Sequence, residues 1–131
     1  METYKATAIR KPKGMYLIYG SPGMGKTSTA KYFPGKTLVL DIDRTSNVLQ
    51  GCDNIDIVAV DNMDTYRFWS ELMIDLVTNY QGVYDNIMVD NLSELERCIL
   101  ADFGRQGKNR GIPAQGDYQV MQFLLVNTLR Y

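Results

Sequence analysis

The stretch Gly20-Ser21-Pro22-Gly23-Met24-Gly25-Lys26-Thr27 fits the phosphate-loop pattern G-x-x-x-x-G-K-[ST] at every fixed position. Its glycines let the backbone curl tightly, so that successive N–H groups point inward and form a nest for an anion. Lys26 is placed to reach the β- and γ-phosphates of a nucleotide, and the Thr27 hydroxyl to bind Mg²⁺. The predicted nucleotide-binding residues are Ser21, Pro22, Gly23, Met24, Gly25, Lys26, Thr27 and Ser28.

The sequence on either side of this loop supports the same interpretation. Met15-Tyr16-Leu17-Ile18-Tyr19 before it predicts a buried strand, and residues 27–32 after it can form a helix. That helix should end before Pro34-Gly35, because proline cannot continue a helix and glycine favours a turn. The alternative is a chance glycine-rich turn in front of a helix.

Composition narrows the class of protein. The chain has 131 residues with 45% hydrophobic content, which is enough for one compact domain. No run approaches the roughly 18 apolar residues of a membrane span, and Met1 to Lys13 lack the apolar core of a signal peptide, so we expect a cytoplasmic protein without a membrane partner. Two distant cysteines and the lack of histidine argue against a zinc site, and the lack of histidine excludes histidine-dependent catalysis.

Charge is distributed unevenly along the chain. Residues 1–37 carry seven basic and one acidic residue, a net charge of +6. Residues 38–102 carry three basic and thirteen acidic residues (−10), and residues 103–131 carry four basic and one acidic (+3). A basic–acidic–basic chain can still present a basic face, so its acidic balance does not exclude nucleic acid as a partner.

The rest of the chain alternates between predicted strands and helices. Strands are expected at residues 37–41, 55–60 and 86–90. An apolar stripe at helical spacing (Phe68, Trp69, Leu72, Met73, Leu76, Val77, Tyr80) predicts a helix that packs on the sheet and ends at Gln81-Gly82. Ser93 and Glu96 have capping-box spacing, which predicts a helix from about Glu94 to Phe103, and a last helix follows Asp117. This alternation predicts an α/β fold with a parallel, doubly wound sheet, preceded by a basic polar lead-in over residues 1–13.

Three acidic residues are candidates for metal binding or catalysis beside the phosphate loop. Asp90 ends an apolar strand in the manner of a Walker B aspartate, which supports Mg²⁺, although a helix cap or a solvated turn is an alternative. Asp41 and Asp43 lie at the end of another strand, where ligand crevices form in open α/β sheets. We predict that Asp43 orients or deprotonates the attacking water, the alternative for both being a role in the turn.

The glycine-rich stretch at residues 104–116 is predicted to be a basic loop. Arg105, Lys108 and Arg110 suit contact with a nucleic-acid backbone, and no aromatic residue lies among them to stack on bases. A solvated loop without a ligand is one alternative. A lid that closes over ATP is another.

Together these segments resemble the RecA-type recombinase ATPase core, in the small single-domain form that bacteriophages encode. The resemblance spans residues 14–131 and is carried by the Walker A loop at residues 20–28, the strand ending Leu40-Asp41-Ile42-Asp43, the Walker B strand at 86–90 and the loop at 104–116. It implies a RecA-like parallel sheet flanked by helices, with ATP and Mg²⁺ as cofactors, Lys26 and Asp43 in catalysis, and Thr27 and Asp90 at the metal. It also implies self-assembly and a single-stranded DNA partner.

Two departures from the family pattern stand out. Asp43 is one methylene shorter than the glutamate usual at this place. The family's next strand, which lies between the phosphate-loop and Walker B strands and ends in a γ-phosphate sensor, has no counterpart before Tyr131. We therefore expect either a truncated chain or another element that fills this gap in the sheet.

The expected function is a DNA-dependent ATPase in phage DNA recombination or replication, located in the host cytoplasm. The alternatives are a small P-loop kinase of nucleosides or nucleotides and a partner protein that binds nucleotide without hydrolysing it. Strand order separates the first two, because pairing of residues 87–89 directly with residues 16–18 would favour the kinase.

Overall fold

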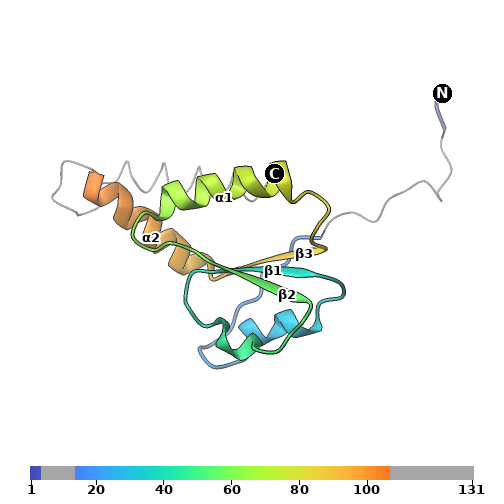
Figure 1. The fold of residues 1–131 in the computed structure, drawn as a ribbon, viewed down its shortest axis with the longest axis horizontal. Helices are drawn as coiled ribbons and strands as arrows, with labels where there is room; N and C mark the ends of the chain where they lie inside the picture. The colour runs from blue at the N-terminus through green and yellow to red at the C-terminus, as the bar shows by residue number, and fades with distance from the viewer. Residues whose placement is uncertain (4–13, 107–131) are drawn as a thin grey trace.

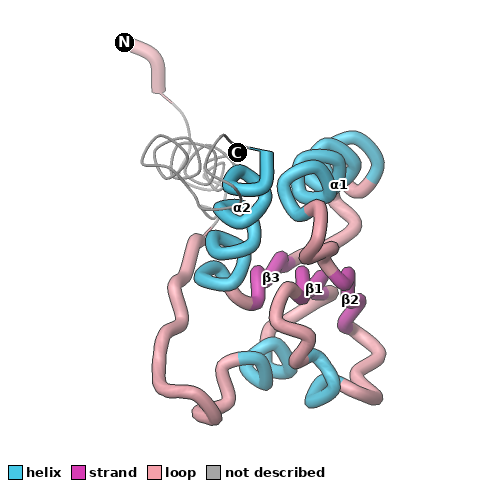
Figure 2. Tube along the Cα trace, turned by 90° about the vertical axis from the view of Figure 1, so that its left-hand side faces the viewer, coloured by secondary structure: helices cyan, strands magenta, loops and turns pink. Residues whose placement is uncertain are grey.

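The computed structural model describes residues 1–3 and 14–106. The strands are β1 (Thr37–Asp41), β2 (Ile55–Ala59) and β3 (Asn86–Asp90); the α-helices are α1 (Thr65–Asn79) and α2 (Leu92–Gln106); the short 3₁₀ helices are η2 (Thr27–Tyr32) and η3 (Ser46–Leu49). The sheet is parallel, with strand order β2-β1-β3. Helices α1 and α2 cover one face of it, and η2 and η3 cover the other (Figures 1 and 2). The predicted α/β class is therefore confirmed.

Strand β1 is the centre of the molecule, and all five of its residues are buried. Leu38 and Leu40 belong to the core beneath α1 and α2, whereas Val39 packs with Ala30 and Leu49 on the other face. A strand covered on both faces needs a continuous apolar run, which Leu38, Val39 and Leu40 supply. In the parallel register, Asp41 is paired with Ala59 on β2 and with Asp90 on β3. Asp41 and Asp90 therefore lie side by side at the carboxyl ends of their strands.

Helix α1 packs its predicted stripe on this core, although not over its whole length. Trp69 is buried, and Phe68, Leu72, Met73 and Leu76 pack against the same cluster. Val77 and Tyr80, at the end of the predicted stripe, are exposed. The stripe turns away from the sheet there as the helix reaches its last residue, Asn79.

Helix α2 begins earlier and ends later than its sequence pattern predicts. The cap is Asn91, whose Oδ1 accepts a hydrogen bond from the backbone N–H of Glu94 at 2.7 Å, so the predicted capping box at Ser93 and Glu96 is wrong. Asparagine is as good an N-cap as serine, and its position directly after β3 starts the helix two residues sooner. The helix then continues to Gln106.

The predicted strand at residues 15–19 is wrong. These residues belong to no strand, and all five side chains are exposed. The segment runs as a loop past β3, on the side away from β1 (Figure 2). An apolar run becomes a strand only if a neighbour satisfies its backbone N–H and C=O groups, and this segment passes the outer edge of β3 without pairing with it. The helix predicted after the phosphate loop is confirmed in position, as the 3₁₀ helix η2, a form common in short stretches.

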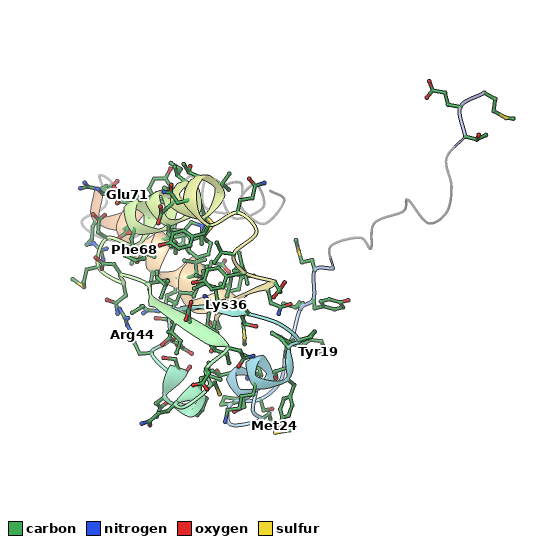
Figure 3. The ribbon with its side chains drawn as sticks, turned by 45° about the vertical axis from the view of Figure 1, so that its right-hand side comes forward. Tyr19, Met24, Lys36, Arg44, Phe68 and Glu71 are labelled. Atoms are coloured by element: carbon green, nitrogen blue, oxygen red, sulfur yellow. The ribbon has the colours of Figure 1, made fainter. Side chains whose placement is uncertain are left out.

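A polar cluster joins the strands at the amino end of the sheet, opposite the phosphate loop. Tyr84 Oη donates a hydrogen bond of 2.7 Å to Asp56 Oδ2. The same oxygen forms an ion pair with Lys36 Nζ at 3.1 Å. The Lys36 ammonium lies 4.9 Å from the centre of the Tyr84 ring. Lys36 and Arg44 mark the opposite ends of the strands in Figure 3.

None of the helices in the described part of the chain has both the length and the apolar character that crossing a bilayer requires.

Candidate functional site

Thr27 and Asp90, the two predicted metal ligands, meet at the carboxyl end of the sheet. Thr27 is the first residue of η2, and Asp90 is the last residue of β3. Thr27 Oγ1 donates a hydrogen bond of 2.5 Å to Asp90 Oδ2. Asp90 is only 6% exposed. Its backbone belongs to β3 and its carboxylate binds Thr27, so the sheet and the loop together hold this side chain in place.

Thr45 is a third oxygen donor at this point, and the sequence pattern did not single it out. Its Oγ1 lies 3.5 Å from Thr27 Oγ1 and 3.5 Å from Asp90 Oδ2. Its backbone N–H donates to Asp41 Oδ1 at 3.3 Å, which ties the loop after β1 to the buried Asp41. A threonine two residues beyond an acid-x-acid strand end is the signal that could have identified it.

The phosphate loop leaves open space above its glycines. Gly23 and Gly25 have φ angles of 79° and 82°, in the left-handed region that glycine tolerates best, and a Cβ at either would meet no atom within 4 Å. Lys26 Nζ donates to two carbonyl oxygens of its own loop, Gly20 O at 2.7 Å and Ser21 O at 3.0 Å. Tyr19, which directly precedes this loop, and Met24, which lies within it, project from the body of the molecule in Figure 3.

Asp43 lies beside Asp90 and is attached to the same corner of the sheet at two points. Its backbone N–H donates to the Asp90 carbonyl at 3.3 Å, and its Oδ2 accepts a hydrogen bond of 2.7 Å from Asn91 Nδ2. Asp43 is exposed, whereas Asp41 is 2% exposed and binds the Thr45 backbone. Of the two candidate carboxylates, Asp43 is therefore the one that a water molecule can reach.

Residues 13–131 match the family model described as an AAA domain. The chain belongs to the AAA domain family. The match extends over the phosphate loop, the sheet and both α-helices, and it makes this AAA domain a P-loop NTPase of the nucleotide-binding, ATPase type. No curated protein and no solved structure matches the chain.

The donor set of the AAA domain fits a hard divalent cation. Thr27, Thr45 and Asp90 supply only oxygen atoms, which Mg²⁺ prefers. Within residues 1–3 and 14–106, no three acidic, histidine or cysteine side chains are arranged so that they could hold a metal ion together. Mg²⁺ keeps several waters and takes few protein ligands when it accompanies a nucleotide, so a sparse oxygen site of this kind is compatible with it.

Arg105, predicted to contact nucleic acid from a glycine-rich loop, lies in the last turn of α2 instead. Its guanidinium forms an ion pair with Asp102 and donates to the Met63 carbonyl at 2.6 Å. Asp102 is 2% exposed and also accepts a hydrogen bond from the Tyr66 backbone at 2.9 Å. In the AAA domain this arginine therefore neutralises a buried carboxylate. The other two predicted contacts, Lys108 and Arg110, lie outside the described residues.

An open hollow of about 490 Å³ lies next to Thr45, at the carboxyl ends of β1 and β2. Its lining residues are Asp41, Arg44, Ser46, Asn47, Gln50, Ile57 and Ala59. Arg44 has a φ of 61° and donates to the Val60 carbonyl at 2.8 Å, which fixes the turn that forms one wall. The AAA domain thus has a mixed polar and apolar surface directly beside its candidate cation site.

Proposed function

We propose that this chain binds ATP with Mg²⁺ and hydrolyses it as a RecA-like ATPase that acts on single-stranded DNA in phage recombination or replication. The observation that carries the proposal is the 2.5 Å contact between Thr27 Oγ1 and Asp90 Oδ2. It places the last residue of the Walker A motif against the aspartate at the end of β3. A hydroxyl and a carboxylate so placed are the protein groups that P-loop NTPases use at the metal.

Lys26 and the loop glycines supply the phosphate contacts in this proposal. The open space above Gly23 and Gly25 admits phosphate oxygens close to the backbone. Lys26 Nζ is at present satisfied by the carbonyls of Gly20 and Ser21, and it exchanges one of these for a phosphate oxygen when nucleotide enters. Thr27 and Asp90 would hold a Mg²⁺ ion there, and the ion would offset negative charge on the nucleotide phosphates.

Asp43 orients the attacking water in this proposal. Its carboxylate is exposed, and its backbone is bonded to the carbonyl of Asp90, so it stands next to the predicted metal site. A carboxylate can accept a proton from water in hydrogen-bond range while aligning a lone pair with the γ-phosphate. Asn91 occupies the position where helicase-type ATPases carry a glutamate, so the water-activating acid must come from another strand.

Strand order does not separate the RecA-like class from the kinase, because residues 15–19 form no strand and so have no place in the β2-β1-β3 order. Strand β3 pairs with β1, and residues 16–18 pair with no strand in the described part of the chain. The direct pairing of residues 87–89 with residues 16–18 that would favour a kinase is therefore not seen among those residues. DNA contact rests on the family resemblance and on the basic residues at 108 and 110, and self-assembly rests on the resemblance alone.

The test is an ATPase assay on the full chain, with and without single-stranded DNA, and separately with a panel of nucleosides and nucleoside monophosphates. We expect Mg²⁺-dependent release of phosphate that single-stranded DNA stimulates. Stimulation by a nucleoside, with transfer of phosphate to it, would identify a kinase. ATP binding without turnover under every condition would identify a non-hydrolysing partner protein.

A further inference from the structure

The Asn91 side chain uses both ends of its amide at the junction of β3 and α2. Its Oδ1 accepts the Glu94 N–H at 2.7 Å, and its Nδ2 donates to Asp43 Oδ2, also at 2.7 Å. Only this orientation satisfies both neighbours, because a flipped amide would set an oxygen against a carboxylate and an NH₂ against an N–H. The helix cap therefore determines which end of Asn91 faces Asp43.

Asp43 has little else to fix its carboxylate. Among residues 14–106, Asn91 is the one side chain that hydrogen-bonds it. The nearest cation on α2, Arg97, is paired with Glu94, and that carboxylate holds the pKa of Arg97 above its ordinary value. An exposed aspartate without a partner samples several rotamers, and a catalytic group that does so spends much of its time out of line with the reacting atoms.

We propose that Asn91 is a positioning residue that holds the Asp43 carboxylate in the orientation needed to align water, while its other end begins α2. The inference rests on the proposed function, in which Asp43 is the water-orienting acid. It also gives a reason for Asn91 after the β3 aspartate: with the acid on the neighbouring strand, this position requires a neutral donor. An acid at both positions would set two carboxylates against each other.

The variant Asn91→Ser separates the two tasks of the side chain. Serine caps a helix as well as asparagine does, so we expect α2 and the melting temperature to be retained. Its side chain is too short to reach Asp43 and lacks the amide donor, so the contact with the Asp43 carboxylate is lost. The turnover number should fall by roughly tenfold to hundredfold, with the KM for ATP changing by less than about twofold, because orientation and not binding is lost. Asn91→Ala should lose the same activity and also melt at a lower temperature. Ser93→Ala, an exposed change in the first turn of α2, is the matched control.

A spectroscopic measurement tests the contact without relying on activity. The side-chain amide resonances of Asn91, followed by NMR on the full chain, should shift and exchange faster with water in Asp43→Ala. They should be unaffected by Thr78→Ala, an exposed change on α1. Resonances of Asn91 that ignore the loss of Asp43 would overturn the proposed contact.

Two kinetic outcomes separate this inference from the function on which it rests. A full rate in Asp43→Ala contradicts the role proposed for Asp43, and the positioning role of Asn91 with it. A lost rate in Asp43→Ala together with a full rate in Asn91→Ser contradicts the positioning role alone. If both are right, the double variant is no slower than Asp43→Ala, because two residues acting as one unit are not additive.

Discussion

Thr27 and Asp90 stand 63 residues apart in the sequence, and the hydroxyl of one donates to the carboxylate of the other over 2.5 Å. The contact joins the phosphate loop to the central sheet, since Asp90 ends β3 and β3 pairs along β1. A loop held this way presents its hydroxyl and a nearby acid as one unit to a cation.

Thr27→Ala and Asp90→Asn should therefore weaken the dependence of ATP affinity on Mg²⁺. Without the hydroxyl or the full carboxylate charge, adding Mg²⁺ should improve ATP binding much less than it does in the unaltered protein. Fluorescence titration with a labelled ATP analogue, in Mg²⁺ and in a chelator, measures the difference. Thr78→Ala is the control, and an unchanged ratio in both site variants would remove these residues from the metal site.

Lys26→Ala should weaken ATP binding by about tenfold or more, because a charge-assisted hydrogen bond to phosphate is lost. Fold stability should change little, because the present contacts of Lys26 are with exposed carbonyls of its own loop. Lys31→Ala, at the other end of η2, removes the same charge outside the loop and should bind ATP normally. Equal losses in the two variants would indicate a general effect of charge instead.

Arg105→Ala should lower the free energy of unfolding by about 1–3 kcal/mol, because among the described residues it leaves the buried Asp102 carboxylate with only the Tyr66 N–H as partner. Urea denaturation followed by circular dichroism measures this. Arg67→Ala removes an exposed ion pair on α1 and should leave stability nearly unchanged. A variant at 105 that is fully stable, yet weaker for DNA, would return this arginine to the role the sequence pattern suggested.

The Tyr84 phenol should titrate well above an ordinary tyrosine. Its hydrogen bond to Asp56, aided by burial, raises its pKa from 10.0 to about 12. A raised pKa in the folded state means that the contact contributes stability below pH 10, which is lost as the pH rises from 10 towards 12. Asp56→Asn should bring the pKa of Tyr84 back towards 10, and ultraviolet or NMR titration of the tyrosines measures it. Titration of Tyr84 at the ordinary value in the unaltered protein would exclude the contact.

The sequence predicts the described strands and helices well wherever the local pattern and the final packing agree. Residues 37–41 and 86–90 are apolar runs bounded by turns, and both lie in the sheet. The segment at residues 15–19 has the same pattern but stays outside the sheet. The difference lies in whether the segment pairs with a neighbouring strand, which a one-dimensional pattern does not describe.

The residues of the candidate site also fall into those that local sequence indicates and those that depend on the folded arrangement. The motif alone points to Lys26, Thr27 and Asp90, because the spacing of a phosphate loop and an acid at a strand end is local information. Thr45 and the double contact of Asn91 depend on which strands lie side by side. Arg105 was predicted to lie in a loop but lies in α2, where it pairs with the buried Asp102 one helical turn away, and a sequence pattern does not report burial.

Calorimetric titration of the full chain with ATP, in Mg²⁺ and then in a chelator, tests the central claim most directly. The account predicts saturable binding of one ATP per chain that Mg²⁺ strengthens and Lys26→Ala weakens. A folded protein that takes up no ATP in the presence of Mg²⁺, or that binds it equally well without Lys26, would contradict it.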